Sequence, residues 1–400
     1  MKILVANLGS TSFKYRLYDL SEAGENLLAR GAIERIGSDN AKVSTQSGRG
    51  KSEQVRPIKD HGDAVQICLD QLVDPSAGVL ADTSEVAAIG FKAVLAKDVS
   101  GVQLVTPAVL DAMDAFADVA PAHNPPYTAA MRMLGERFPT IPLVAAFETG
   151  FHQTIPDGNR RYAIPDDWTN RLGIRRWGFH GNSHTYISRR MVELVGRDGL
   201  KVISCHLGGS SSICAIRDGK SVATSMGMSP QSGLPQNNRV GDLDVFALPA
   251  IMRATGLTLE RVLDTLANQS GFQGMGGVGN DLRDIEAAAA AGNDRAKQAL
   301  DVYISSARHY LGAYLVELGG ADAIAFTGGI GENSSLVREG ICRDLGWFGI
   351  KLDPAANASG PDERIVSTPD SRVEVWTVPT NEEIVVARHV RDLLSSGQNA

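Results

Sequence analysis

The sequence predicts an α/β protein made of two duplicated domains, and three observations lead to this fold class. Its 400 residues exceed what one ordinary hydrophobic core holds. Apolar residues make up 43%, charged residues 21%, and there are 42 glycines, as is typical of α/β proteins with many tight turns. The third observation is an internal repeat, because the pattern of residues 2–19 returns at 201–218, half a chain later.

The first copy of the repeat predicts a β-hairpin. Residues 2–6 are apolar and β-branched, 7–12 make a small polar turn, and 13–18 alternate large apolar or aromatic residues with basic ones. The turn offers backbone N–H groups and hydroxyls, and Lys14 offers positive charge, so a phosphate cradle is one interpretation. A plain structural turn is the other, since most hairpins of this kind bind nothing.

The second copy matches the first at a constant offset of 199 residues. Lys2 corresponds to Lys201 and Asp19 to Asp218, and the Leu-Gly pair of the turn recurs in the same register. Several matches at one register indicate a duplicated domain rather than chance. Two such turns would place two phosphate cradles across one cleft.

Hydrophobic periodicity and chain breakers predict the other elements of the first half. The proline-rich stretch 120–126 stops the helix before it. The last strand delivers Glu148 at its carboxyl end, where ligands bind in open α/β sheets. The expected elements are an exposed loop or edge hairpin at 37–51, helices at 63–72, 109–116 and 127–138, and buried strands at 86–94 and 143–147.

A domain boundary is expected near residue 150, where long apolar runs become scarce. The N-terminal domain would span 1–150 and the C-terminal, nucleotide-binding domain 151–383. The terminal helix, at about 384–396, is expected to pack back on the N-terminal domain.

The second half contains two further turns of interest. A strand running into Gly-Gly-x-Gly at 328–331 and then a helix is typical of a nucleotide-phosphate or adenosine-edge turn. The terminal helix starts near Asn381 and Glu382, which would hold Mg²⁺-bound waters or form a plain capping box. The other expected elements are helices at 181–194, 245–255, 259–267, 284–291 and 296–318, strands at 201–206, 323–326 and 373–378, a polar loop at 230–244, and a glycine-rich stretch at 271–280.

Charge and cysteine usage exclude several function classes. A net charge of −7 without a Lys/Arg run gives no reason to expect nucleic acid, and no apolar run approaches a membrane-spanning length. Four cysteines without metal spacing predict free thiols, buried at Cys205 and Cys214. Because Met1 leads straight into a strand, no signal peptide is expected, and a reducing cytoplasm fits.

Several motifs together resemble the acetate kinase family over essentially the whole chain. They are Asn7-Leu8-Gly9-Ser10, 147–152 (Phe-Glu-Thr-Gly-Phe-His), Gly178-Phe179-His180-Gly181, His206-Leu207-Gly208, 326–333 and Thr380-Asn381-Glu382-Glu383. The resemblance implies two duplicated actin-like (ribonuclease H-like) domains around a central cleft, the fold shared by sugar kinases, actin and heat-shock chaperones. It also implies a homodimer that reversibly phosphorylates a short-chain carboxylate with ATP and Mg²⁺ (or Mn²⁺), forming an acyl phosphate and ADP.

The resemblance also implies roles for individual residues. Positive charge around the equatorial oxygens is what in-line phosphoryl transfer requires, and the planar fork of Arg239 can hold two of them. The implied roles are metal binding by Asn7 and Glu382; nucleotide binding by Lys14, His206, Leu207, Gly208, Gly209, Ser210, Asp281, Leu282, Arg283, Gly329, Ile330, Gly331, Glu332 and Asn333; catalysis by Glu148, His180 and Arg239; and substrate binding by Lys92, Val94, Ala122, Phe179 and Pro230.

The chain departs from the family pattern mainly in the substrate half. The family's substrate-binding arginine is Lys92, which keeps the charge but loses the bidentate grip, and its active-site aspartate is Glu148. Ala122 replaces a leucine of the pocket wall, Gly209 replaces an asparagine, and the run 235–238 is distinctly more polar. These changes favour a carboxylate larger or more polar than acetate over acetate or propionate itself.

Other interpretations stay open at this stage. A non-catalytic actin-like protein that only binds nucleotide, or a kinase that uses pyrophosphate, would also fit parts of the pattern. Glu148 could merely stabilise the fold, and His123 could brace its turn. We expect His184, one helical turn after His180, to be a structural hydrogen-bonding residue, and His206 could be satisfied inside the core.

Overall fold

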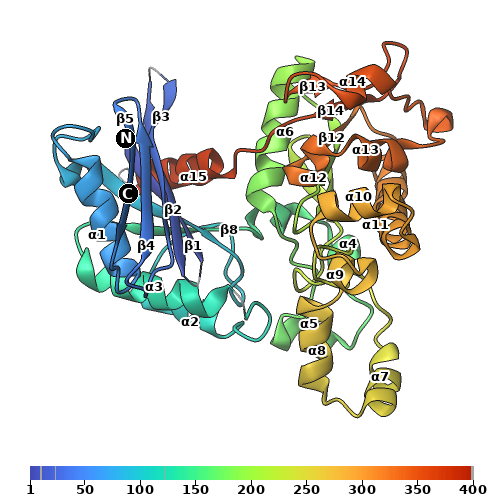
Figure 1. Ribbon diagram of the computed structural model, residues 1–400, viewed down its shortest axis with the longest axis horizontal. Coiled ribbons are helices and arrows are strands. Elements are labelled where there is room, and N and C mark those ends of the chain that lie inside the picture. The colour runs from blue at the N-terminus through green and yellow to red at the C-terminus, as the bar shows by residue number, and fades with distance from the viewer. Residues whose placement is uncertain (10, 23, 122, 398–400) are drawn as a thin grey trace. The chain divides into compact units, whose positions relative to one another are not determined.

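The computed structural model describes residues 1–9, 11–22, 24–121 and 123–397 (Figure 1). The chain divides into two compact units. Unit 1 comprises Met1–Gly150 and Asn381–Ala400, and unit 2 comprises Phe151–Thr380. The chain therefore leaves unit 1 after Gly150 and returns to it for its last helix.

Unit 1 is built on a mixed sheet with the strand order β5-β4-β3-β2-β1-β6-β8-β7. The pairs β1–β6 and β6–β8 are parallel, and the other neighbours are antiparallel. The strands are β1 (Lys2–Gly9), β2 (Ser12–Ser21), β3 (Gly24–Glu34), β4 (Ala41–Ser47), β5 (Gly50–Arg56), β6 (Val86–Ala93), β7 (Val102–Leu104) and β8 (Leu143–Phe147).

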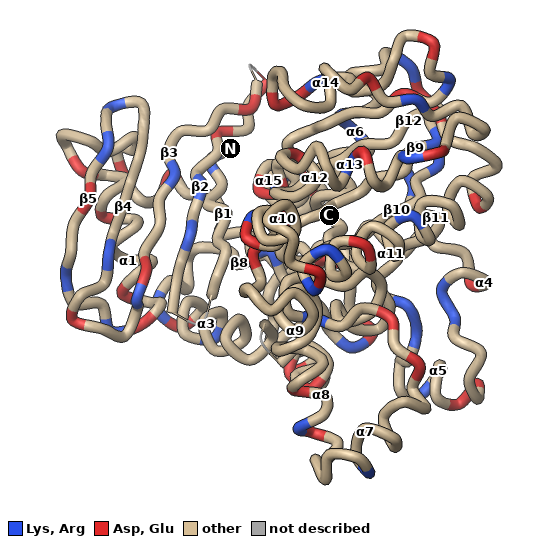
Figure 2. The backbone as a smooth tube through the Cα atoms, turned by 45° about the vertical axis from the view of Figure 1, so that its right-hand side comes forward, with Lys and Arg blue, Asp and Glu red and all other residues tan. Residues whose placement is uncertain are grey.

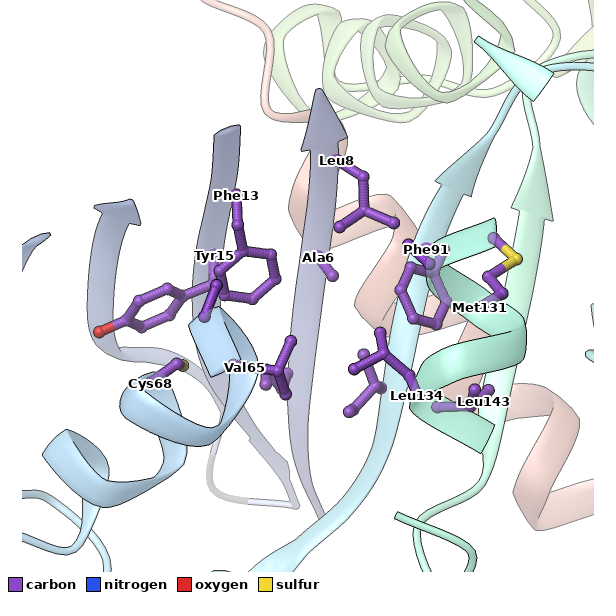
Figure 3. Close-up of a cluster of buried hydrophobic side chains, with 14 of the residues drawn as sticks. Ala6, Leu8, Phe13, Tyr15, Val65, Cys68, Phe91, Met131, Leu134 and Leu143 are labelled. Carbon is purple, nitrogen blue, oxygen red and sulfur yellow. The ribbon is translucent and has the colours of Figure 1, made fainter. Parts of the chain in front are cut away.

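Helices cover this sheet from both faces. Figure 3 shows Ala6 of β1, Phe13 of β2 and Phe91 of β6 gathered with Val65 of α1 and Leu134 of α3 in one buried cluster. On the other face, Gly90 lets α15 approach closely, because a Cβ there would lie 2.7 Å from Val390 of α15. The helices of unit 1 are α1 (His61–Leu72), α2 (Pro107–Asp114), α3 (Asn124–Arg137) and α15 (Glu382–Gly397).

The segment 37–51, expected to be a loop or edge hairpin, contributes to an edge hairpin. Strands β4 and β5 pair in antiparallel register at the end of the sheet. The edge strand β5 carries charged residues of both signs (Figure 2), and Lys51 pairs with Glu53 on that strand itself. Charged side chains on an edge strand hinder pairing with another chain.

Unit 2 repeats the central strand order of unit 1. Its sheet runs β11-β10-β9-β12-β14-β13, and β9–β12 and β12–β14 are parallel, as β1–β6 and β6–β8 are. The predicted duplication is thereby confirmed. The strands are β9 (Lys201–His206), β10 (Ser212–Arg217), β11 (Lys220–Thr224), β12 (Ala323–Thr327), β13 (Arg364–Ile365) and β14 (Glu374–Thr377).

The core of unit 2 lies between its sheet and α11, whose Tyr303 and Leu311 are buried. A smaller cluster forms on the other face, where Ile187 of α6 packs. The helices are α4 (Asp157–Arg160), α5 (Asp166–Leu172), α6 (Gly181–Val195), α7 (Ala247–Thr255), α8 (Leu259–Asn268), α9 (Gly271–Gly276), α10 (Leu282–Ala290), α11 (Asp294–Leu318), α12 (Gly328–Asn333), α13 (Ser335–Cys342) and α14 (Pro354–Ala358).

The predicted constant offset of 199 residues between the two hairpins holds for their first strands but is wrong for their second strands. Asn7 pairs with Lys14 in unit 1, and the matching position His206 pairs with Ser212 in unit 2. Ser212 therefore corresponds to Lys14, not to Phe13. Five residues, 207–211, separate the paired positions in unit 2, against six, 8–13, in unit 1, and this one-residue deletion shifts the register of the returning strand.

Two local predictions also need correction. The turn expected at 7–12 is shorter, because β1 continues to Gly9 and places Asn7 inside a strand. The glycine-rich stretch 271–280 contains helix α9, whose first residue, Gly271, has a φ of +58°. A Cβ at Gly271 would lie 1.9 Å from the carbonyl oxygen of Gln236, so glycine is needed for this close approach.

All four cysteines are buried and free, as predicted for Cys205 and Cys214. Within the described part of the chain, no helix is long and apolar enough to cross a membrane.

Candidate active site

In unit 1, Asn7 is held by a tyrosine that sequence reasoning missed. The Tyr127 hydroxyl donates to Asn7 Oδ1 at 3.1 Å and accepts a hydrogen bond from the Leu8 backbone N–H at 3.2 Å. Burial raises the pKa of Tyr127 to about 12, so the hydroxyl keeps its proton and remains a donor. No local signal distinguishes this residue from other aromatic core residues of α3.

Lys92, Glu148 and Glu382 form a buried charge cluster. Lys92 lies near the carboxyl end of β6, Glu148 directly follows the parallel neighbour β8, and Glu382 is the first residue of α15. Lys92 Nζ lies 3.5 Å from Glu148 Oε1 and also forms an ion pair with Glu382. Adjacent parallel strands end at the same edge of the sheet, which explains why Lys92 and Glu148 meet.

The two carboxylates keep Lys92 charged. Burial alone would lower the pKa of its ammonium group, but Glu382 and Glu148 together raise that pKa above the ordinary value. The Glu148 side chain is only 4% exposed, against 26% for Lys92. The cation assigned to the substrate carboxylate is therefore already paired with two carboxylates of the protein itself.

The oxygen donors of unit 1 fit a magnesium ion that arrives with a nucleotide. Asn7 supplies an amide oxygen, and Glu382 supplies a carboxylate. In the described residues, no group of three or more His, Cys, Asp or Glu side chains is arranged to hold a metal by itself. Magnesium commonly binds one or two protein carboxylates and takes its other ligands from phosphates and water, so the donor set is compatible with it.

Lys14 lines an open hollow on the sheet of unit 1. Asn7, Arg16, Arg30 and Glu383 line the same hollow. Arg16 is partly neutralised by Glu383, 3.5 Å away, whereas the exposed Lys14 makes no ion pair within the described residues. An exposed ammonium group beside other cations suits a phosphate-bearing ligand.

Of the remaining predicted residues of unit 1, Val94 follows β6 and is half-buried. Ala122 lies outside the described residues.

In unit 2, His180 stands at the start of α6 in a left-handed conformation, with a φ of +56°. Its ring stacks on that of His206, with 4.2 Å between the centroids. Its Nδ1 lies 2.8 Å from the Ser212 hydroxyl oxygen on β10. The stacked ring and the serine together fix the orientation of the imidazole.

Two further histidines, His184 and His152, form hydrogen bonds next to His180. His184, expected to be structural, is fully buried and bonds Ser204 through Nδ1 at 2.8 Å and Ser212 through Nε2 at 2.9 Å, which confirms that expectation. Burial lowers the pKa of His184 well below its ordinary value, so the ring is neutral. His152 Nε2 lies 2.9 Å from the carbonyl oxygen of Phe179, next to His180 in the chain.

The turn after β9 is joined to the turn after β12. Leu207 donates its N–H to the carbonyl of Thr327, and its own carbonyl accepts from the N–H groups of Ile330 at 2.8 Å and Gly331 at 3.0 Å. Gly328 has a φ of +77°, and a Cβ there would lie 2.7 Å from the Leu207 carbonyl oxygen. The structure thus brings together two of the segments assigned to the nucleotide.

Arg239 reaches the same turn from the polar loop. Its guanidinium donates to Ser210 Oγ and to Gln236 Oε1, both at 3.2 Å. Gln236 is fully buried and donates to the carbonyl of Pro230 at 2.8 Å. Burial lowers the pKa of Arg239, yet no carboxylate pairs with it in the described residues. A half-buried cation without a counterion is a candidate partner for an anionic ligand.

The remaining nucleotide candidates make local contacts. Asp281 caps α10 by accepting from the Arg283 N–H at 2.9 Å and also pairs with the Arg283 guanidinium, which lowers the pKa of Asp281 to about 2. Leu282 is buried. Glu332 accepts from the Gly328 N–H at 2.8 Å, and Asn333 donates to the Gly329 carbonyl at 2.9 Å. Glu332 and Asn333 therefore stabilise the turn of α12.

Two sheets with the same central strand order, each with covering helices, define the class of this protein as a duplicated actin-like α/β protein. Comparisons with known proteins support this fold and also identify the family. The sequence profile of the Acetokinase family matches residues 2–388.

Acetate kinase from Pseudothermotoga lettingae is 41% identical over 400 residues, covering 99% of this chain and 98% of its own. Porphyromonas gingivalis acetate kinase has a similar structure, with a TM-score of 0.88 at 36% identity over 98% of this chain and 99% of its own. A propionate kinase from Francisella tularensis gives a TM-score of 0.88 at 32% identity, over 97% and 98%.

The chain therefore belongs to the acetokinase family. It is a carboxylate kinase of the acetate and propionate kinase type, a phosphotransferase with a carboxyl group as acceptor.

Proposed function

We propose that this protein transfers the terminal phosphoryl group of ATP, reversibly, to a short carboxylate such as acetate or propionate. A carboxylate oxygen forms a bond to the γ-phosphorus, the bond from that phosphorus to the bridging oxygen of ADP breaks, and an acyl phosphate and ADP result. The acid is already ionised near pH 7, so its attack needs no general base. Catalysis then depends on positioning and on positive charge around the transferred group.

The observation that carries this proposal is that, among the residues the structure describes, no carboxylate pairs with Arg239. One guanidinium nitrogen of Arg239 donates both to Ser210, in the turn assigned to the nucleotide phosphates, and to Gln236 of the polar loop. We assign Arg239 and His180 to the equatorial oxygens of the transferred phosphoryl group. The turn residues 206–210 and 329–331 take the nucleotide phosphates and ribose, and 281–283 take the adenine edge.

In unit 1, we assign Lys14 to the nucleotide phosphates. Asn7 and Glu382 would hold Mg²⁺, or Mn²⁺ in its place, and a bound cation would neutralise charge on the phosphates. Lys92 would bind the carboxylate of the acid, and Glu148 would keep the ammonium group oriented. We assign the half-buried Val94 to the acyl chain of the acid, and we propose the same role for Phe179 and Pro230 of unit 2.

The polar run 235–238, one of the departures from the family pattern, has a structural role within the protein. Gln236 is a buried member of the polar run 235–238. Its amide N–H donates to the carbonyl of Pro230, and its amide oxygen accepts from Arg239. Its polarity therefore serves the protein and gives no support to a polar substrate. On this ground we propose acetate or propionate as the substrate, in place of the larger or more polar acid that the sequence favoured.

Trapping of the acyl phosphate with hydroxylamine tests the proposal. The purified protein is given ATP and Mg²⁺ with acetate, propionate, butyrate, lactate and succinate in turn, and hydroxamate is measured against acid concentration. Hydroxamate from acetate or propionate with the highest kcat/KM supports the proposal. A clear preference for a larger acid would show that the proposed substrate is wrong. The absence of hydroxamate with every acid would overturn the carboxylate-kinase assignment.

Two controls accompany this assay. Pyrophosphate in place of ATP tests the donor, and we expect no product from it. Arg239→Ala is compared with Arg261→Ala, since the exposed Arg261 pairs with Asp264 on α8, and within the described residues no ion pair or hydrogen bond joins its side chain to the turn or to the polar loop. Equal losses in both variants would show that the effect of Arg239→Ala is not specific.

A further inference from the structure

A chain of hydrogen bonds connects His180 to the interior of unit 2. It runs from Ser204 on β9 through His184 on α6 and Ser212 on β10 to Nδ1 of His180. Ser204, His184 and Ser212 are all fully buried, so water cannot substitute for any of these bonds. Each link is 2.8 or 2.9 Å long.

The chain has only two consistent proton arrangements, because each member is restricted. His184 is neutral and carries one N–H, and each serine hydroxyl has one hydrogen to donate. If the proton of His184 is on Nε2, then Ser212 accepts it and donates its own hydrogen to Nδ1 of His180. If that proton is on Nδ1, every bond reverses, and Nδ1 of His180 must carry a hydrogen instead.

Ser204 distinguishes the two arrangements. His184 is the one hydrogen-bond partner of its hydroxyl within the described residues. In the first arrangement Ser204 donates to Nδ1 of His184, and every hydrogen of the chain has an acceptor. In the reversed arrangement Ser204 accepts from His184, and its own buried hydrogen has no acceptor, which is costly in a protein interior.

We propose that Ser204, His184 and Ser212 are positioning residues that hold His180 as the neutral tautomer with its proton on Nε2. The assignment rests on the proposed function for its catalytic meaning: a proton on Nε2 makes that nitrogen a hydrogen-bond donor for the transferred phosphoryl group. The tautomer itself follows from the hydrogen-bond chain alone and is measured without any turnover.

The test is ¹⁵N NMR of the full-length protein labelled in the histidine rings. The chain holds 8 histidines, and His180→Ala assigns the resonances of His180. We expect the ring of His180 to be neutral with hydrogen on Nε2 at pH 7.5. A ring with hydrogen on Nδ1, or on both nitrogens, would overturn the proposal, and the readout is made on the wild-type protein, with His180→Ala used only for assignment.

Variants then test how the tautomer is set. Ser204→Ala removes the donor that decides the direction, so a signal from the Nδ1–H tautomer of His180 should appear although Ser204 does not touch this ring. Ser204→Thr keeps a hydroxyl and should restore the wild-type signal. Ser221→Ala is the matched control, because Ser221 is a buried serine that bonds His152 at 2.9 Å and lies outside the chain.

Activity separates this inference from the proposed function. We expect Ser212→Ala to lower kcat about tenfold with little change in KM for the acid, as is common when a residue that orients a functional histidine is lost. If His180→Ala forms acyl phosphate at the wild-type rate, the role of His180 fails while the tautomer result stands. If the His180 tautomer is unchanged in both Ser204→Ala and Ser212→Ala, the hydrogen-bond chain does not set the tautomer, and the inference is overturned.

Discussion

Lys92 near the end of β6 and Glu382 at the first turn of α15 form an ion pair that joins the terminal helix to the sheet of unit 1. Glu148 completes the cluster, 3.5 Å from the same ammonium group. Removing the shared cation would leave two carboxylates facing each other in a mostly buried site. The cluster therefore stabilises unit 1 in addition to the substrate role proposed for Lys92.

Lys92→Met should consequently lower the free energy of unfolding by about 2 kcal/mol. Breaking a fully buried ion pair costs about 3–5 kcal/mol, and the 26% exposure of the Lys92 side chain reduces this figure. Urea unfolding followed by circular dichroism measures the loss, and hydrogen exchange should quicken in β6 and α15. Lys220→Met, at an exposed lysine without an ion pair among the described residues, should change stability little. If both variants are equally stable, the cluster contributes nothing.

Arg239→Ala should reduce kcat by at least about a hundredfold, the usual cost of losing one donor to a developing anionic charge. Arg239→Lys should recover only part of the rate, because an ammonium group cannot hold two oxygens in a fixed fork. Steady-state kinetics with ATP and the best acid of the panel measures both. A wild-type rate in Arg239→Ala would remove this residue from the catalytic group.

The stability of unit 2 should fall as the pH drops below about 6.5, partly because of His152. Burial lowers the pKa of His152 from 6.5 to about 4. Between these values the unfolded chain binds a proton that the folded chain does not, so stability is full above 6.5 and is lost as the pH falls toward 4. At roughly 1.4 kcal/mol per pH unit, His152 accounts for about 3 kcal/mol over that range, and burial of His184 acts in the same direction.

Tryptophan fluorescence measures this dependence in unit 2 alone, because all 4 tryptophans of the chain lie between residues 151 and 380. Urea unfolding at pH 7, 6 and 5 should show a shallower loss in His152→Gln than in the wild type. His309→Gln, on the exposed side of α11, is the control and should leave the slope unchanged. Identical slopes in all three proteins would contradict the role of His152.

Gly328→Ala and Gly329→Ala should differ sharply although the two positions are adjacent. At Gly328 the φ of +77° strains an alanine, and the new Cβ would lie 2.7 Å from the Leu207 carbonyl oxygen, so we expect a loss of about 2 kcal/mol or more. At Gly329 a Cβ meets nothing within 4 Å, and alanine suits helix α12 better than glycine does. Urea unfolding followed by tryptophan fluorescence compares them. Similar stabilities would show that the link between the two turns is not tight.

Most of the secondary structure was predictable because it depends on local patterns. Buried strands such as β8 and β12 are continuous apolar runs, and long helices such as α11 show the helical period, so both kinds of element can be located within a few residues. Helix α9 was missed because its glycines, read locally, indicate a loop. Gly271 is there for a contact with Gln236, 35 positions earlier in the chain, and no local pattern contains that contact.

The sequence by itself determined the duplication, the positions of the buried strands along the chain and the family, because repeats, hydrophobic periodicity and motifs can be read from the residues without their three-dimensional contacts. Only the tertiary structure decided which side chains share a site. Lys92 meets Glu382 across 290 positions, and hydrogen bonds through His184 and Ser212 connect Ser204 to His180. Such partners are chosen by strand register and by helix packing, and a single residue of register, as between the two hairpins, changes which side chain faces which.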